Sequence, residues 1–415
     1  MIEQSEQPVR IAFLLDNLSG GGAEKVILNL AAGFARLGHP VDLLVCKAEG
    51  VLQNYIPAGV NLIPLRPVSS ARGTVSALFA DPAGYREILG TVIRRKKLPK
   101  AFRYIPAISR HLKQSGASLL VSALPKSNIN AVLAQRMSGT DTRVVLGAHI
   151  HLSAQDSEGA SRGKVRIRSL RPMMQRYYHQ AAAVVAVSKG VERDTKAYLN
   201  LPQDIVKTIY NPVAAREIKN LSEESPEHAW FESRDVPVVL GIGRFVQQKN
   251  FPLLVRAFAE LRKKRPVRLV LLGGDESSGE QAQHKAELEE LADELGVAED
   301  FDMPGYKENP YPYFRRASVF ALSSRFEGFG NVLVEALFCG CPVVSTDCPS
   351  GPAEILRDGE FGRLVSIDDA QGMADALDAV LDEKIDSRVL RARGEEFSVD
   401  QAVDNYNELF NRLVS

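Results

Sequence analysis

Short runs of apolar residues alternate with longer amphipathic stretches along most of this chain of 415 residues. The first apolar run covers residues 9–15. The segment after it places Val26, Leu30 and Phe34 on one face of a helix, and a second apolar run follows at residues 41–46. Continuous apolar strands separated by amphipathic helices are typical of parallel sheets that helices cover on both faces. The pattern therefore predicts an α/β protein.

This alternation occurs twice. The first series continues through residues 117–122, 143–148 and 183–187, and the second runs through residues 236–243, 268–272, 319–322, 342–345 and 362–365. A polar segment, residues 214–235, separates them. We therefore predict two α/β domains of similar size, residues 1–210 and 211–397, with parallel sheets facing a central cleft where a ligand binds.

Two segments depart from the alternation. We predict that residues 66–115 form an insertion that is basic and mostly helical. The pattern of the last segment, residues 398–415, indicates an amphipathic helix whose apolar face includes Val403, Tyr406 and Phe410.

The net charge of zero conceals an uneven distribution. Residues 1–200 contain 27 Lys and Arg against 13 Asp and Glu, and the remainder contains 24 against 38. The basic residues cluster beside aromatic and apolar ones: residues 94–97 precede Phe102, Tyr104 and Ile105, and residues 162–176 precede Tyr177 and Tyr178. Basic residues mixed with aromatics favour contact with an anionic membrane through the N-terminal half. Nucleic acid is not an expected partner, because no nucleic-acid motif accompanies them.

The remaining composition indicates a globular protein of a reducing compartment. The four cysteines, Cys46, Cys339, Cys341 and Cys348, have no metal-ligand spacing and are expected to be buried thiols. The polar start, residues 1–7, does not resemble a signal peptide, and no apolar run reaches the roughly 18 residues of a membrane span. We expect a cytoplasmic chain.

The segment from Glu327 to Glu335 carries the strongest chemical signal. Its helical pattern begins at Asn331, so Asn331 and Glu335 lie one turn apart on one face. Glu327 lies in the loop that leads into this helix. A helix N-terminus offers free backbone N–H groups to phosphate or hydroxyl oxygens, and two carboxylates suit a polyhydroxylated ligand.

Two cations follow the first strand of the second series. Arg244 and Lys249 lie in the loop between that strand and the next helix, directly after Gly243. A planar guanidinium and a compact ammonium at such a position can neutralise a departing diphosphate without a metal ion. Removing either cation is expected to abolish most turnover and to leave the fold intact.

Two features of the first half also occupy strand ends. The glycine loop Gly20-Gly21-Gly22 precedes a helix, but Lys25 stands where a dinucleotide fingerprint has its third glycine. His149 and His151 follow the strand at residues 143–148, where cleft residues gather, and a single histidine there is also compatible with a structural role.

Together these motifs resemble those of the family-4 retaining glycosyltransferases, glycosyl transferases group 1. The resemblance rests on Glu-x7-Glu at Glu327 and Glu335, on Gly-Arg-x4-Lys at Gly243, Arg244 and Lys249, and on Gly-Gly-x-Glu at Gly21 and Gly22. It covers nearly the whole chain. It implies the GT-B fold, in which an acceptor-side domain (1–210, with the helix 398–415 packed back on it) faces a nucleotide-sugar-binding domain (211–397).

The resemblance also implies roles for individual residues. Glu335 binds the ribose hydroxyls of the donor, and Glu327 with the backbone of Gly328, Phe329 and Gly330 holds the sugar. The N–H groups of Asn331 and Val332 face the diphosphate. Tyr306 falls in the base-binding loop, Gly21 and Gly22 approach the donor phosphate or the acceptor, and Arg244 and Lys249 stabilise the leaving group. His149 fits the family's histidine near the donor sugar better than His151 does, although Ile150 departs from the usual Asn.

The expected activity is a retaining, metal-independent transfer of a hexose or N-acetylhexosamine from a UDP-sugar. The acceptor is expected to be a glycan or lipid-linked precursor of bacterial polysaccharide or lipopolysaccharide, at the inner face of the plasma membrane. No cofactor or metal is expected, and Asp300 and Asp302, the one Asp-x-Asp, are interpreted as structural. Three alternatives remain at this stage: a double displacement through Glu327, a nucleotide-sugar epimerase, and a non-catalytic nucleotide-sugar-binding protein.

Overall fold

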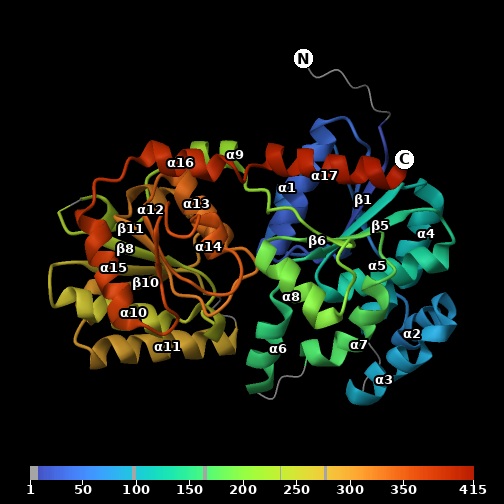
Figure 1. Cartoon of the computed structure of the whole chain (residues 1–415), viewed down its shortest axis with the longest axis horizontal. Helices are drawn as coiled ribbons and strands as arrows, with labels where there is room; N and C mark the ends of the chain where they lie inside the picture. The colour runs from blue at the N-terminus through green and yellow to red at the C-terminus, as the bar shows by residue number, and fades with distance from the viewer. Residues whose placement is uncertain (1–7, 96–99, 162–165, 234, 275–277) are drawn as a thin grey trace. The chain divides into compact units, whose positions relative to one another are not determined.

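The computed structural model describes residues 8–95, 100–161, 166–233, 235–274 and 278–415, which form two compact units (Figure 1). The first unit comprises the chain up to Pro212 together with Val399–Ser415, and the second is Val213–Ser398. The boundary lies two residues after the predicted one. Val213 belongs to the second unit because its N–H donates to the carbonyl oxygen of Phe397 (2.9 Å) and because it bridges Ser398.

The first unit is built on a parallel sheet with the strand order β3-β2-β1-β4-β5-β6-β7. Its strands are β1 (Ile11–Asn17), β2 (Val41–Lys47), β3 (Val60–Pro64), β4 (Leu119–Ala123), β5 (Arg143–Ala148), β6 (Ala183–Ala186) and β7 (Val206–Thr208). Its helices are α1 (Gly22–Arg36), α2 (Ser70–Ala80), α3 (Tyr85–Arg95), α4 (Ile105–Ser115), α5 (Pro125–Ser138), α6 (Leu152–Ser161), α7 (Arg166–Tyr178), α8 (Lys189–Leu199) and α17 (Val399–Val414). The insertion predicted at residues 66–115 thus consists of α2, α3 and α4 with short 3-10 turns.

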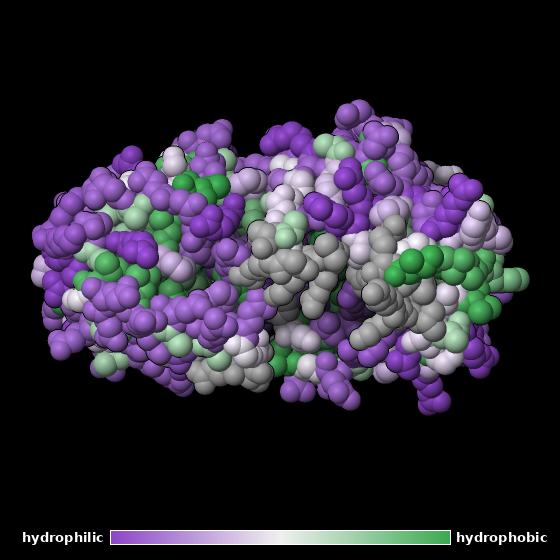
Figure 2. Space-filling model, turned by 90° about the horizontal axis from the view of Figure 1, so that it is seen from below, coloured by the Kyte–Doolittle hydropathy of each residue, from purple (hydrophilic) through white to green (hydrophobic). Residues whose placement is uncertain are grey.

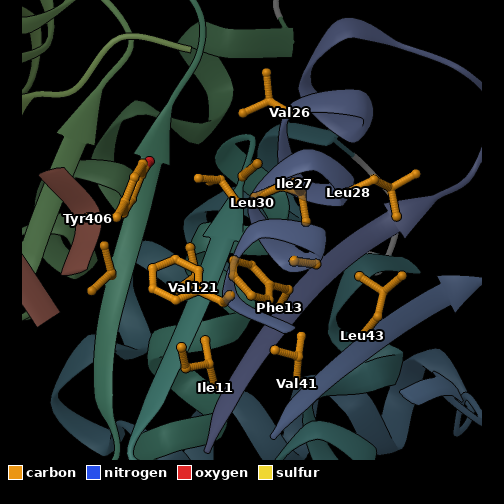
Figure 3. Packing of buried hydrophobic residues seen from close by; sticks show 14 of the residues in the cluster. Ile11, Phe13, Val26, Ile27, Leu28, Leu30, Val41, Leu43, Val121 and Tyr406 are labelled. Atoms are coloured by element: carbon orange, nitrogen blue, oxygen red, sulfur yellow. The ribbon is translucent and has the colours of Figure 1, made fainter. Parts of the chain in front are cut away.

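The core of the first unit includes the last helix of the chain (Figure 3). Helix α17 packs on α1, where the rings of Phe34 and Phe410 stack with their centroids 5.1 Å apart. A Cβ atom at Gly33 would lie 2.3 Å from the side chain of Val403, so only glycine allows the two helices to approach this closely. Residues about 370 positions apart in sequence therefore share one core.

The second unit repeats the architecture with the strand order β10-β9-β8-β11-β12-β13, again parallel. Its strands are β8 (Val238–Ile242), β9 (Arg268–Leu272), β10 (Phe301–Gly305), β11 (Val319–Leu322), β12 (Val343–Thr346) and β13 (Arg363–Val365). Its helices are α9 (Ala215–Leu221), α10 (Phe251–Arg262), α11 (Gly279–Glu294), α12 (Tyr311–Arg316), α13 (Asn331–Cys339), α14 (Pro352–Ile355), α15 (Ala370–Asp382) and α16 (Ser387–Glu395). The prediction of two Rossmann-like α/β domains with parallel sheets is confirmed.

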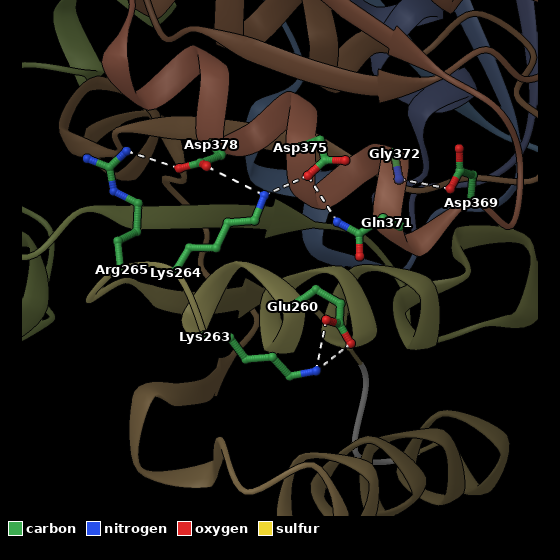
Figure 4. Close-up of polar contacts among 9 residues, drawn as sticks. All are labelled: Glu260, Lys263, Lys264, Arg265, Asp369, Gln371, Gly372, Asp375 and Asp378. Carbon is green, nitrogen blue, oxygen red and sulfur yellow. Dashed lines mark hydrogen bonds and ion pairs between the residues drawn. The ribbon is translucent and has the colours of Figure 1, made fainter.

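Helix α15 is joined to the end of α10 by surface ion pairs (Figure 4). The Lys264 ammonium lies 2.6 Å from a carboxylate oxygen of Asp375, and the Arg265 guanidinium lies 3.2 Å from Asp378. Such exposed pairs contribute little stability each. The buried contacts of Phe258 with the hydrophobic cluster that contains Met373 and Leu377 supply most of the adhesion between the two helices.

Two edge strands, β3 and β7, were missed in the sequence. Each lies at one edge of the first sheet and is only partly buried, so neither has the continuous apolar run of an interior strand. Their mixed composition removes the periodic signal on which the prediction depends.

The aromatic residues beside the basic clusters do not have the predicted exposure. Phe102, Ile105, Tyr177 and Tyr178 are all buried in the first unit. They fill the core, so they are not available for contact with a membrane. Residues 96–99 and 162–165, which carry part of both basic clusters, lie outside the described residues.

One cation of the second cluster has an internal partner. The guanidinium of Arg176 donates to the buried carboxylate of Asp81, with Nε 2.5 Å from Oδ2, and Arg136 lies 3.3 Å from the same carboxylate. The hydrogen bond from Arg176 lowers the pKa of Asp81 below its ordinary value. Part of the basic surplus is therefore used to hold the end of α2 against α5 and α7.

In both sheets the strand order reverses beside the first strand of the unit. In the first unit this point lies between β1 and β4, and in the second it lies between β8 and β11. Loops that leave the carboxyl ends of the two strands there diverge to opposite sides of the sheet and leave a crevice for ligand. The two loops of the second unit are those that carry Arg244, Lys249 and Glu327.

Candidate active site

A buried ion pair joins the two loops at the switch point of the second sheet. The ammonium of Lys249, in the loop after β8, lies 2.6 Å from Oε1 of Glu327, in the loop after β11. The side chains are only 14% and 10% exposed. The hydroxyl of Ser324 donates to the same Oε1 (2.7 Å). Both partners of the carboxylate among the described residues use Oε1, so Oε2 is the oxygen that can accept from a ligand.

Backbone contacts fix the two loops against each other. The N–H of Arg325 donates to the carbonyl oxygen of Gln248 (2.8 Å), and the amide of Gln248 donates to the carbonyl of Phe326 (2.9 Å). The hydroxyl of Ser323 donates to the carbonyl of Lys249 (2.7 Å). Because the loops are held at several points, Lys249 and Glu327 are pre-positioned before any ligand arrives.

Glycine 243 makes room for the lysine. A Cβ atom at Gly243 would lie 3.1 Å from the side chain of Lys249, so the lysine stem crosses over this glycine on its way to Glu327. Gly273, at the end of β9, has φ +122°, and its Cβ would lie 2.1 Å from the Gly243 carbonyl oxygen. The predicted Gly243 thus shapes the site through its backbone and through the absence of a side chain.

Arg244 differs from Lys249 in its surroundings. Its side chain is exposed, and within the part of the chain that the structure describes it makes no hydrogen bond or ion pair. The charge of Lys249 is offset by that of Glu327 at 2.6 Å. Arg244 is therefore the cation of this loop that has no counter-charge among the residues that the structure describes.

Helix α13 begins directly after Glu327 and is capped by a glycine. Gly330 is its N-cap residue, with φ +101°, and brings no side chain to satisfy the first turn. Phe329 is buried and contacts the Phe397 ring (centroids 5.4 Å apart), which leaves only its backbone for a ligand. The start of α13 has the arrangement that binds phosphate at helix N-termini.

The loop after β12 closes against this segment. Its Pro349 carbonyl accepts from the N–H of Glu327 (3.1 Å). Gly351 has φ +100°, and a Cβ there would lie 1.7 Å from the carbonyl oxygen of Phe329, which excludes any other residue at this position. Ser350 has φ +70° and a buried hydroxyl without a partner among the described residues.

The remaining predicted donor residues of this unit lie around α13 and β10. Glu335 is half-buried, one turn beyond Asn331, and its carboxylate adds to the effect of burial in raising the pKa of Tyr311. Val332 and Gly328 are also half-buried. Tyr306, directly after β10, is 59% exposed. Its ring is accessible to a ligand at the carboxyl edge of the sheet.

In the first unit the glycine loop leaves β1 at the corresponding switch point. Gly21 is the N-cap of α1, and Gly22 is its first residue. A Cβ at Gly21 would lie 2.2 Å from a carboxylate oxygen of Glu24, which is itself buried. A side chain at position 21 would therefore displace the Glu24 carboxylate, which folds over this glycine. Asp42, near the start of β2, is paired within this unit, because its carboxylate hydrogen-bonds Arg10, Asn61 and His111.

The two histidines after β5 have different environments. His151 lies 3.4 Å from the carboxylate of Asp194, which accepts from the N–H groups of Leu152 and Ser153 at the start of α6. His149 instead packs over the strand end, since a Cβ at Gly147 would lie 2.6 Å from its Nε2 atom. His151 thus has a structural task, and His149 is the candidate for contact with substrate.

We expect His149 to make the protein less stable in acid. Burial lowers the pKa of His149 to about 4, from an ordinary value of 6.5. The neutral ring is favoured in the folded state, so its contribution is complete above pH 6.5 and is lost as the pH falls towards 4. Between pH 7.5 and 4.5, His149→Gln is expected to lose about 2–3 kcal/mol less unfolding free energy than the unmodified chain in denaturant titrations. Parallel pH profiles would contradict this assignment.

Asp300 and Asp302 point to separate partners. Asp300 accepts from Arg262 (2.7 Å), and Asp302 lies 2.8 Å from the ring of His228. No group of three or more His, Cys, Asp or Glu side chains suited to a metal ion occurs in the described ranges. The contacts agree with the structural interpretation of this Asp-x-Asp.

The four cysteines are buried and unpaired, as predicted. Cys348 lies close enough to Glu327 that burial and this carboxylate raise its pKa to about 12. It is therefore a neutral thiol beside the site and is unsuited to act as a nucleophile.

Three residues that organise the site were not found in the sequence: Gln248, Ser323 and Ser324. A signal was available for two of them, because Ser323 and Ser324 are polar residues directly after the apolar strand β11, where site residues gather in α/β sheets. Gln248 acts through contacts with a distant loop, for which a single sequence carries no signal.

Two protein families match this chain, each over one unit. The model described as Glycosyltransferase Family 4 matches residues 20–217, and the model described as Glycosyl transferases group 1 matches residues 224–397. Two Rossmann-like units of this order and composition define the GT-B class of glycosyltransferases. The chain belongs to the group 1 glycosyltransferases of family 4, as its motifs predicted.

Two of the relatives are named for steps in bacterial glycan synthesis. An N-acetylgalactosamine-N,N'-diacetylbacillosaminyl-diphospho-undecaprenol 4-alpha-N-acetylgalactosaminyltransferase of Campylobacter jejuni is 31% identical over 260 residues, 63% of this chain and 66% of that protein. The lipopolysaccharide core biosynthesis glycosyltransferase LpsE of Rhizobium meliloti is 37% identical over 42% of this chain and 50% of its own length. The matched segments thus span between half and two thirds of these relatives.

Solved structures share the fold over nearly the whole chain. A glycosyltransferase of Rickettsia africae aligns with a TM-score of 0.74 and 16% identity, covering 99% of this chain and 100% of that one. Anabaena HepE in complex with UDP and glucose aligns with a TM-score of 0.73 and 18% identity, covering 97% and 99%. At these identities the likeness establishes the fold.

Proposed function

We propose that this protein transfers a hexose or N-acetylhexosamine from a UDP-sugar to a lipid-linked or lipopolysaccharide-type acceptor, with retention of configuration and without a metal ion. The observation that carries the proposal is the cluster at the β8/β11 switch point, where Arg244, Lys249 and Glu327 lie beside the glycine-capped start of α13. It combines cations for a diphosphate with a carboxylate for sugar hydroxyls.

The proposed chemistry is electrostatic. The diphosphate sits at the N–H groups of Asn331 and Val332, and as its bond to the sugar breaks, Arg244 and Lys249 stabilise the negative charge that it gains. The acceptor hydroxyl attacks the same face of the sugar through an oxocarbenium-like state. Glu327 accepts a sugar hydroxyl through Oε2, and its pairing with Lys249 through Oε1 makes it a poor nucleophile. His149, neutral at pH 7, donates or accepts a hydrogen bond near the donor sugar.

Relatives support the choice of donor and acceptor. The Campylobacter enzyme is named for a diphospho-undecaprenol acceptor, the Rhizobium relative is named for lipopolysaccharide core synthesis, and HepE was solved with UDP and glucose. A second Campylobacter GalNAc transferase named for a PP-undecaprenol acceptor is 23% identical over 98% of both chains. A polyprenyl or lipid A anchor would place the reaction at the inner face of the plasma membrane, although none of the helices within the described ranges is long and apolar enough to cross a membrane.

We expect a UDP-sugar to raise the melting temperature, with EDTA present. A ligand at 100 times its Kd stabilises the folded state by about 2.7 kcal/mol, which corresponds to a shift of about 5–10 °C for a unit of this size. Glu335→Ala, which removes the proposed ribose ligand, should abolish most of the shift. Arg256→Ala, an exposed arginine on α10, serves as the matched control and should keep it.

Other outcomes separate the alternatives. The absence of a shift with every nucleotide-sugar, or a shift that EDTA removes, would contradict the proposal. Conversion of the donor to an epimer without acceptor would identify an epimerase, and binding without turnover on any acceptor would identify a binding protein. The anomeric coupling constant of the product distinguishes retention from inversion.

A further inference from the structure

Helices α2 and α3 carry large apolar side chains on the side that faces solvent. Val75 and Phe79, one turn apart on α2, are 65% and 74% exposed. On α3, Tyr85, Leu89 and Ile93 follow at intervals of four residues and are 48%, 39% and 73% exposed. Figure 2 shows hydrophobic residues gathered at the end of the molecule that these helices occupy. These five residues are here called the α2–α3 apolar face.

The packing of α2 is the reverse of that in an ordinary surface helix. Its buried positions are the small residues Gly73, Thr74, Ala77 and Ala80. Gly73 lies so close to the backbone of Phe102 that a Cβ there would be 2.7 Å away. A surface helix normally turns its large apolar residues inward, so their outward position on α2 requires a partner outside the chain.

The described exposed charges in the segment that carries this face are all positive. Within the described part of residues 66–113 the exposed charged residues are Arg66, Arg72, Arg86, Lys100, Arg110 and Lys113. Neither of the two acids of this segment is exposed. Asp81 is buried and paired with Arg176, and Glu87 is half-buried, with one carboxylate oxygen inaccessible to solvent. The guanidinium of Arg86 lies 5.8 Å from the Tyr85 ring centroid, which places a cation beside an aromatic residue of the apolar face.

We infer that the α2–α3 apolar face inserts into the surface of an anionic lipid bilayer. Apolar side chains that project from a cationic surface match the acyl boundary and the negative headgroups of such a membrane. A second copy of the chain is a poorer occupant, because self-association through this face would bring like charges together. The inference rests on the proposed function to the extent that a lipid-linked acceptor requires the enzyme at a membrane. The inferred membrane contacts are thus the five residues of the α2–α3 apolar face. The predicted residues Phe102, Ile105, Tyr177 and Tyr178 are buried and are not among them.

Cosedimentation with vesicles of phosphatidylglycerol and phosphatidylcholine tests the inference. The unmodified chain should bind, more weakly on pure phosphatidylcholine and at high salt, where the headgroup attraction is absent or screened. Phe79→Ser/Ile93→Ser should weaken the binding by at least about tenfold, since each buried side chain of this size is worth about a factor of ten or more. The control Leu37→Ser/Val389→Ser removes two apolar residues elsewhere that are each about half exposed, and it should leave binding unchanged.

Fluorescence provides a second measurement that does not depend on loss of binding. Trp230 is the only tryptophan, so Phe79→Trp adds one reporter on the face, and Val389→Trp adds one away from it. Anionic vesicles should shift the emission of the first variant to shorter wavelength and leave that of the second unchanged. The inference is overturned if the unmodified chain does not bind, if the serine variant binds as well as the control, or if the serine substitutions instead convert a dimer to a monomer. The melting shift with a UDP-sugar should be equal in all variants, so its absence would count against the proposed function alone.

Discussion

Replacement of Arg244 by alanine is expected to reduce turnover by about 10²- to 10³-fold without altering stability. The magnitude is that of losing one pre-positioned donor to a charge that develops in the transition state. Stability should remain within about 0.5 kcal/mol, because the side chain is exposed and has no partner in the described part of the protein. Steady-state kinetics and denaturant unfolding of the same preparation measure the two quantities.

Two further variants make the Arg244 result interpretable. Arg244→Lys should recover only part of the activity, since a point charge replaces a planar fork that can bind two phosphate oxygens. Arg256→Ala removes an exposed arginine on α10 and should be as active as the unmodified chain. An Arg244→Ala enzyme with near-normal kcat would refute the leaving-group role.

Lys249 is expected to behave differently, because its removal should destabilise the protein as well as inactivate it. Lys249→Met leaves the Glu327 carboxylate, 7% exposed, without its cation at 2.6 Å, and such a loss costs about 3 kcal/mol or more. Glu327→Gln leaves the ammonium unpaired in the same way. In the double variant neither charge remains, so the unfolding free energy should return most of the way to that of the unmodified chain, while activity stays absent.

The double-mutant cycle has a clear opposing result. If the losses of unfolding free energy from the two single substitutions simply add in the double variant, the ion pair does not stabilise the fold and Lys249 has only a catalytic task. The sequence treats Arg244 and Lys249 as equivalent cations whose removal leaves the fold intact. The structure separates them, because within the described residues Lys249 has a counter-charge and Arg244 has none.

Local periodicity was sufficient to predict the interior strands and the class of fold. β5, β9 and β11 begin and end at the predicted residues, since buried parallel strands are continuous apolar runs. The apolar face of α17 could also be read from its spacing. By contrast, β3 and β7 lie at sheet edges and lack the pattern.

For the candidate site, the sequence supplied residues whose chemistry is unusual in their local context, such as Arg244, Lys249 and Glu327. It could not supply contacts between loops. The pairing of Lys249 with Glu327, the glycine required at position 351 and the contacts of Asp194 with the start of α6 depend on segments that meet only in the folded chain. The burial of Phe102, Tyr177 and Tyr178 could not be predicted either, because aromatic residues beside basic ones have the same sequence pattern whether they fill a core or face solvent.

The return of α17 to the first unit has a consequence for the order in which the protein matures on the ribosome. The first 212 residues emerge first, yet the surface of α1 that holds Gly33 and Phe34 has no cover until residues 399–415 have been made. The second unit, Val213–Ser398, has all of its residues earlier. The domain that is synthesised first is thus completed last, and any nascent chain that stops short of α17 displays an apolar surface that chaperones and proteases recognise.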